Sequence, residues 1–166
     1  MNYRDAVNLV PMQETDFTAF STRVLSSYAE TNVRAGIWLP EEALYRSNAD
    51  LNKLLPDGQL TAKQLFLSII EQSTGNKVGT MWAGPEPGSN ETVYFLFDIY
   101  INEKYRRRGF ASKSIRTLER TLTAINVRSI KLQVFVFNFA AREMYESLGY
   151  SIYSHAMIKH VMADPA

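Results

Sequence analysis

The order of hydrophobic and polar residues predicts a strand followed by two helices at the start of the chain. Residues 7–11 form a short apolar run that is typical of a strand. From residue 17 to residue 28, hydrophobic residues recur at spacings of three and four, which is the pattern of an amphipathic helix. Pro40 and the two glutamates after it predict the first turn of a second helix. We expect that helix to end near Leu55, before a Pro-Asp-Gly sequence.

The middle of the chain changes to the patterns of β-strands. Residues 65–70 and 78–83 predict a hairpin whose turn contains Gly75. Residues 92–101 are apolar at almost every position, and Asp98 is the one charged residue among them. A run that is apolar on both faces is typical of a strand in the middle of a sheet.

The last third of the chain alternates between helical and strand patterns. Apolar residues from 111 to 125 recur at spacings of 4, 3, 4 and 3, which predicts a helix. A further helix has its apolar face over residues 141–148 and Gly149 as its cap. Three more strands are expected, at residues 130–137, 150–153 and 157–162. The order β-α-α-β-β-β-α-β-α-β-β indicates a mixed α/β layer fold.

Length and charge indicate one domain without a polyanionic partner. The chain has 166 residues, 46% of them hydrophobic, which is enough for one core and one domain over residues 1–166. The 18 Lys+Arg against 17 Asp+Glu give a formal net charge of +1. Proteins that bind nucleic acid or anionic membranes need a strong basic excess, so we expect neither partner. No apolar run approaches the roughly 18 residues of a membrane span.

The residue types that are missing limit the chemistry further. The absence of cysteine excludes disulfides and a thiolate nucleophile, and it fits a cytoplasmic location. The two histidines, His155 and His160, lie together near the C-terminus, which argues against a histidine metal centre and a Ser-His-Asp triad. Carboxylates, tyrosines, backbone amides or a bound cofactor must therefore perform any reaction.

Residues 98–112 carry the most informative pattern. A strand leads into a basic turn that ends in Gly109, and a helix follows. Backbone amides at a helix N-terminus have no helical partner and lie at the positive end of the dipole, so the turn could hold a phosphate or pyrophosphate. A solvated basic turn is the alternative, and the glycine pattern matches neither Walker A nor the dinucleotide fingerprint.

The same region resembles a known family. Residues 106–111, Arg-Arg-Arg-Gly-Phe-Ala, fit the Arg/Gln-x-x-Gly-x-Gly/Ala signature of the GNAT superfamily of acyl-CoA-dependent N-acetyltransferases. Residues 98–105 resemble its fourth strand, and residues 138–150 resemble its Asn-x-x-Ala-x-x-x-Tyr-x-x-x-Gly-Phe/Tyr helix. Arg107 departs from the pattern, because many members have glycine there. The resemblance is strong from about residue 78 and implies a GNAT-like fold: a mixed, mostly antiparallel central sheet flanked by helices.

The resemblance implies acetyl-CoA as co-substrate and no metal. The pyrophosphate would lie on the amides of the turn, and the pantetheine would run along the fourth strand like an added strand. The implied cofactor-binding residues are Ile99, Ile101, Arg106, Arg107, Arg108, Gly109, Phe110, Ala111, Ser112 and Asn138. The acetyl group would pass directly to the amine of a small molecule or peptide within a ternary complex. A homodimer is a possible assembly.

Tyr145 matches the family's general acid. A phenol with a pKa near 10 can protonate the departing CoA thiolate. The alternative is a core tyrosine, because Tyr145 shares the apolar face of its helix with Ala141 and Leu148. With Asn138 and Gly149 in register, we favour the catalytic role.

Asp98 is the best candidate for the general base. Strand alternation places it on one face with Tyr94, Leu96 and Tyr100. A carboxylate in such a strand should be paired or should have a raised pKa. An aspartate satisfied by a strand bulge is the alternative, and Glu103 is a weaker candidate for the base.

The sequence does not identify the amine that would accept the acetyl group. Tyr28, Trp38, Glu41 and Glu42 lie in or near the helix pair that would face the acceptor channel in this fold, but ordinary surface and core packing explains them better, so they are not assigned to the site. A non-catalytic acyl-CoA-binding module is the alternative function. A nucleic-acid-binding domain is a third, which the charge balance disfavours.

Overall fold

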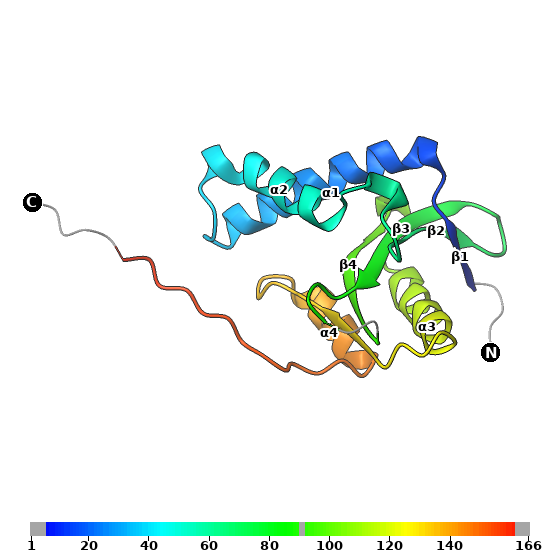
Figure 1. Ribbon diagram of the computed structural model, residues 1–166. Helices are drawn as coiled ribbons and strands as arrows, with labels where there is room; N and C mark the ends of the chain where they lie inside the picture. Colours follow the sequence, from blue (N-terminus) through cyan, green and yellow to red (C-terminus); the bar gives the residue numbers. More distant parts are fainter. Residues whose placement is uncertain (1–5, 90–91, 162–166) are drawn as a thin grey trace, which may run out of the picture.

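A five-stranded sheet forms the centre of the molecule. The computed structural model describes residues 6–89 and 92–161, and its strands lie in the order β1-β2-β3-β4-β5 (Figure 1). The strands are β1 (Val7–Pro11), β2 (Leu65–Glu71), β3 (Lys77–Pro85), β4 (Val93–Ile101) and β5 (Ser129–Leu132). The α-helices are α1 (Glu14–Arg34), α2 (Pro40–Leu54), α3 (Phe110–Thr123) and α4 (Phe139–Ser147).

The sheet is antiparallel from β1 to β4, and β5 joins it in parallel. On one side β4 pairs with β3 from Tyr94 to Ile101. On its other side β4 pairs with β5 only from Val93 to Leu96. Among the described residues, the edge of β4 from 97 to 101 therefore has no strand beside it. The mixed, mostly antiparallel sheet flanked by helices is confirmed.

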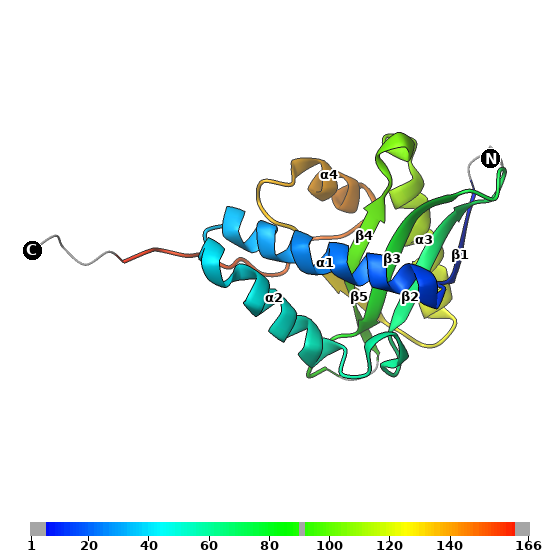
Figure 2. The same cartoon turned by 90° about the horizontal axis from the view of Figure 1, so that it is seen from above.

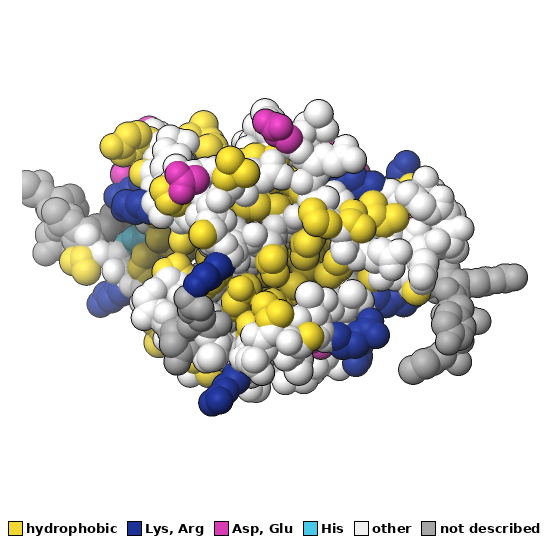
Figure 3. All heavy atoms as spheres, turned by 45° about the vertical axis from the view of Figure 1, so that its right-hand side comes forward, with side chains coloured by type: hydrophobic (Ala, Val, Ile, Leu, Met, Phe, Trp, Pro, Cys, Tyr) yellow, Lys and Arg dark blue, Asp and Glu magenta, His cyan; other side chains and the backbone are white. Residues whose placement is uncertain are grey.

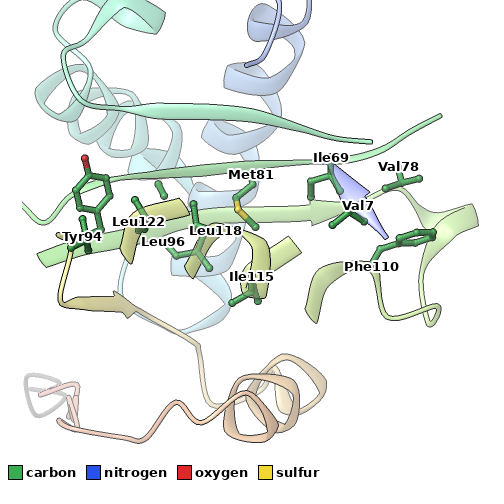
Figure 4. Close-up of a cluster of buried hydrophobic side chains, with 12 residues drawn as sticks. Val7, Ile69, Val78, Met81, Tyr94, Leu96, Phe110, Ile115, Leu118 and Leu122 are labelled. Carbon is green, nitrogen blue, oxygen red and sulfur yellow. The ribbon is translucent and has the colours of Figure 1, made fainter. Parts of the chain in front are cut away.

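Helices cover both faces of this sheet. In Figures 1 and 2, α1 and α2 lie over one face, and α3 and α4 lie over the other. Ile115 and Leu118 of α3 are buried against Met81 of β3 (Figure 4). On the opposite face, Phe20 of α1 packs with Trp82 of β3. The spacings of three and four in these helices produce the two cores, because they place the apolar side chains on one face.

Most of the predicted elements are confirmed, but the chain end differs. Residues 150–161 form no strand, so the two predicted closing strands are wrong. Tyr150 is partly buried, residues 151–161 are exposed, and Met162 lies outside the described residues. The strand predicted at 130–137 ends at Leu132. The apolar pattern is present in this segment, where Met157 is 97% exposed. A pattern alone does not supply the neighbouring strand that a ladder requires.

Charged side chains are spread over the surface. On the face in Figure 3, hydrophobic side chains gather in the middle, and lysine and arginine side chains lie toward the edges. This mixture agrees with the formal net charge of +1. Within the described ranges, no helix has both the length and the apolar character needed to cross a membrane.

We expect Leu118→Ala to lower the free energy of unfolding by about 2–5 kcal/mol, because it leaves a cavity between α3 and the sheet. Urea unfolding followed by circular dichroism measures the change. Leu44→Ala on α2 is the control, since Leu44 is 59% exposed, and it should change stability little. Equal losses in the two variants would contradict this assignment of the core.

Candidate active site

A cavity of about 540 Å³ lies between α1, α2, β4 and the segment that joins β5 to α4. Four of the predicted site residues line it: Asp98, Ile99, Asn138 and Tyr145. Ile101 and the residues of the basic turn do not line it. The structure thus brings both predicted catalytic residues to one cavity and separates them from the predicted phosphate site.

A bulge in β4 sets which side chains reach this cavity. Trp82 of β3 lies opposite Asp98, but the next residue, Ala83, lies opposite Leu96, so Phe97 is the extra residue. The Phe97 ring stacks on Trp82 with ring centroids 4.4 Å apart. Side chains of a strand normally point to alternate faces of the sheet, and the extra residue reverses that order for the residues after the bulge.

The prediction that Asp98 shares a strand face with Tyr94, Leu96 and Tyr100 is therefore wrong in part. Tyr94 and Leu96 are buried on the α3 side of the sheet. Asp98 and Tyr100 instead face α1, where Arg23 contacts both of them. Simple period-2 alternation cannot place Asp98, because a bulge adds one residue to the repeat.

Asp98 forms an ion pair with Arg23 of α1. The guanidinium Nη2 lies 2.6 Å from Oδ2, and Nη1 lies 3.1 Å from Oδ1, so the pairing is bidentate. Nη2 also lies 3.3 Å from Oγ1 of Thr80. The Asp98 side chain is 16% exposed. The partnered carboxylate predicted for this strand is confirmed.

Tyr145 lies on the cavity wall in a position fixed by the end of α4. Gly149 has φ of 95° and its N–H bonds to the carbonyl of Glu146, while the N–H of Tyr150 bonds to the carbonyl of Tyr145. This ending brings the Tyr150 ring to 5.7 Å from the Tyr145 ring. The helix cap predicted at Gly149 is confirmed.

Burial, and secondly the negative charge of Asp98, raise the pKa of the Tyr145 phenol to about 12. A raised pKa favours the protonated phenol, and deprotonation begins only as the pH approaches that value. The Tyr145 phenol therefore stays protonated at neutral pH.

The open edge of β4 overlaps the cavity at Phe97, Asp98 and Ile99. Ile99 and Ile101 pack against the core on the α3 side, so their side chains hold the strand in place. On the side away from β3, the main chain at residues 97–101 has no strand beside it in the described structure. Asn138 caps α4, accepting a hydrogen bond from the N–H of Ala141 at 3.4 Å, and lines the cavity beyond this edge. This unpaired edge suits a ligand that forms hydrogen bonds to the main chain of β4, as an additional strand would.

At the far end of β4, the basic turn leads directly into α3. Gly109 is the N-cap of α3 with φ of 76°, and glycine has no side chain that could cap the helix. The amides of Phe110, Ala111 and Ser112 begin the helix, where backbone donors have no intrahelical acceptor. These donors and the helix dipole are suited to an anion.

The arginines of this turn have different surroundings. Arg108 binds Oε1 of Glu71 at 2.8 Å, and the Glu71 side chain is only 4% exposed. Arg106 donates from Nε to the carbonyl of Ile101 at 3.0 Å. Arg107 has a left-handed backbone, with φ of 61°. The Arg108 side chain therefore anchors the turn to β2.

Apart from Tyr28, the other residues considered from the sequence do not line the cavity. The Glu103 side chain is exposed and pairs with Arg106 at 3.5 Å. The Glu42 carboxylate accepts the N–H of Leu39 at the start of α2. Trp38 packs edge-on against Tyr28, with centroids 5.1 Å apart. Of the four residues considered for the acceptor, Tyr28 alone lines the cavity.

Comparison with known proteins identifies the family. The sequence profile described as the Acetyltransferase (GNAT) family matches residues 32–150. The chain belongs to the GNAT family of acetyltransferases. It is 33% identical over 144 residues to the uncharacterized N-acetyltransferase YycN of Bacillus subtilis, covering 87% of this chain and 92% of YycN. It is also 25% identical over 156 residues to the N-acetyltransferase YdgE of the same organism, covering 94% and 99% of the two chains.

Solved structures share the fold. The crystal structure of YycN from Bacillus subtilis matches with a TM-score of 0.87 and 31% identity, covering 95% of this chain and 100% of that chain. AAC(6')-Iy, in complex with the bisubstrate analogue CoA-S-monomethyl-acetylneamine, matches with a TM-score of 0.57. Its identity is 17%, over 95% of this chain and 99% of that chain, so this likeness concerns the fold alone. The protein is thus a GNAT acetyltransferase.

Sequence reasoning missed two residues that fix the GNAT site, Arg23 and Glu71. Arg23 follows Phe20 at a spacing of three and precedes Val24, so it lies on the buried face of α1. A cation on a buried helix face signals a buried partner, and this signal could have found it. Glu71 ends an apolar strand with no sequence feature that points to Arg108.

We expect Arg107→Gly to raise the free energy of unfolding by about 0.5–1 kcal/mol, because glycine adopts the left-handed backbone without a Cβ clash. Urea unfolding measures it. Arg106→Gly is the control: Arg106 has φ of −64°, and the variant loses a hydrogen bond to Ile101, so stability should fall. A less stable Arg107→Gly variant would show that the arginine side chain stabilises the turn.

Proposed function

We propose that this GNAT enzyme transfers the acetyl group of acetyl-CoA directly to an amine within a ternary complex. The observation that carries the proposal is the open edge of β4 at residues 97–101, which borders a cavity lined by Tyr145 and Asp98. In this proposal the donor lies along β4 and the acceptor lies between β4 and the α1–α2 pair. Direct transfer requires the acetyl donor and the amine acceptor to be bound at the same time.

Acetyl-CoA supplies the acetyl thioester. The amides at the start of α3 would bind its pyrophosphate, with Arg106 and Arg107 nearby as positive charges. The residues proposed for the cofactor are those from Arg106 to Ser112, with Ile99, Ile101 and Asn138 along the pantetheine. The CoA analogue bound by AAC(6')-Iy, which has the same fold, supports this proposal.

The proposed reaction forms a C–N bond and breaks the C–S bond. The amine must attack without its proton, and a lysine-like amine has a pKa of about 10.4, so a proton acceptor is needed. We assign that role to Asp98. A backbone amide near Ile99 would polarise the thioester oxygen. The phenol of Tyr145 would then protonate the departing thiolate.

We expect Tyr145→Phe to lower kcat about 100-fold, because the thiolate loses its proton donor. Release of CoA thiol from acetyl-CoA in the presence of an amine measures the rate, and calorimetry should show unchanged binding of acetyl-CoA. Because the pKa of Tyr145 is raised to about 12, wild-type kcat should show no loss from phenol ionisation between about pH 7 and 10.

Tyr45→Phe is the matched control, since Tyr45 is exposed on α2 and does not line the cavity. It should leave kcat unchanged. Equal rates in wild type and Tyr145→Phe across the pH range would remove the acid role. Binding of acetyl-CoA without any thiol release would instead indicate a non-catalytic acyl-CoA-binding module.

We expect Asp98→Asn to lower kcat/KM about 100-fold by removing the proton acceptor. The variant also leaves Arg23 without its anion, so a second variant, Arg23→Gln/Asp98→Asn, removes both charges. It should be as slow as Asp98→Asn. Recovery of activity in the double variant would show that Asp98 serves only to pair Arg23, and an unaltered rate in Asp98→Asn would place the acceptor elsewhere.

A further inference from the structure

We propose that the acceptor is an amine on an apolar body, of arylalkyl or branched alkyl type, and not a polycation. This inference rests on the proposed function, because it concerns the acceptor side of the same cavity. The inference follows from the side chains that form the wall of the cavity and from the partners of the carboxylates in that wall.

Aromatic and aliphatic side chains form most of the wall. The Phe97 ring lies 5.0 Å from Phe95 and stacks on Trp82, which is 2% exposed. Leu51 and Leu54 face them from α2. Such a surface gains free energy by covering an apolar group and offers little to a strongly hydrated one.

The two carboxylates of the wall already have partners. Glu86 accepts hydrogen bonds from Lys131 Nζ at 2.8 and 2.9 Å, so both its oxygens are engaged. Asp98 is held in the same bidentate way by Arg23. A polyamine or aminoglycoside would have to leave water without a free anion for its additional ammonium groups, which is costly.

The remaining polar groups of the wall are neutral. Ser27 and Thr31 contribute hydroxyls from α1, and Gln133 and Asn138 contribute amides. The Thr31 hydroxyl already donates to the carbonyl of Ser27 at 2.7 Å. Such groups can orient one neutral amine but cannot neutralise several cations. Aminoglycoside acetyltransferases share this fold, but their likeness of 15–17% identity does not extend to specificity.

The test uses the full chain with acetyl-CoA and five amines: phenethylamine, tryptamine, isoamylamine, spermidine and kanamycin. We expect kcat/KM for phenethylamine to exceed that for spermidine at least about tenfold. Transfer to spermidine or kanamycin with equal or higher kcat/KM would overturn the inference and leave the proposed function standing. Acetyl-CoA binding without thiol release from any amine would overturn the proposed function and this inference with it.

A charge variant tests the physical reason. Ser27→Asp adds an unpaired carboxylate to the wall at an exposed position, so it should lower the phenethylamine-to-spermidine ratio of kcat/KM about tenfold. Thr22→Asp adds the same charge on α1 outside the wall and should leave the ratio unchanged. An equal ratio in the two variants would contradict selection by paired charges.

Discussion

The separation of β4 from β5 is the constraint on which the rest of the site depends. Pairing stops after Leu96, and the bulge at Phe97 follows directly. Backbone that would otherwise be satisfied within the sheet becomes available to a ligand. The same bulge turns Asp98 toward α1 while Ile99 stays in the core below. The end of the β5 pairing leaves this edge open, and the bulge beside it turns the Asp98 carboxylate toward α1.

Charge pairing around this opening is nearly complete. Glu71 holds Arg108, Arg23 holds Asp98, and Lys131 holds Glu86, each from a different part of the chain. Partly buried charges are tolerated because each has a partner with good hydrogen-bond geometry. These pairings leave the site close to neutral, and the Tyr145 phenol within it is uncharged at neutral pH.

Sequence periodicity predicted most of the fold, and two motifs located the turn before α3 and the helix that bears Tyr145. The face of Asp98 could not be predicted, since a bulge depends on how β3 registers with β4 and leaves no mark on the alternation of β4 alone. The segment 150–161 shows the converse failure: it has the apolar pattern of strands but no neighbouring strand. The hydrophobic pattern of a segment indicates the secondary structure that this segment favours, whereas strand pairing depends on two segments.

The ion pair of Arg23 has a consequence for divergence within the family. The matched family region begins at residue 32, so Arg23 lies outside it although its partner Asp98 lies inside. A relative with a neutral residue at position 23 would keep both motifs and yet carry an unpartnered carboxylate in its cavity. A single substitution in α1 can thus change the charge of the cavity while residues 106–111 and 138–150 stay the same and give no sign of it.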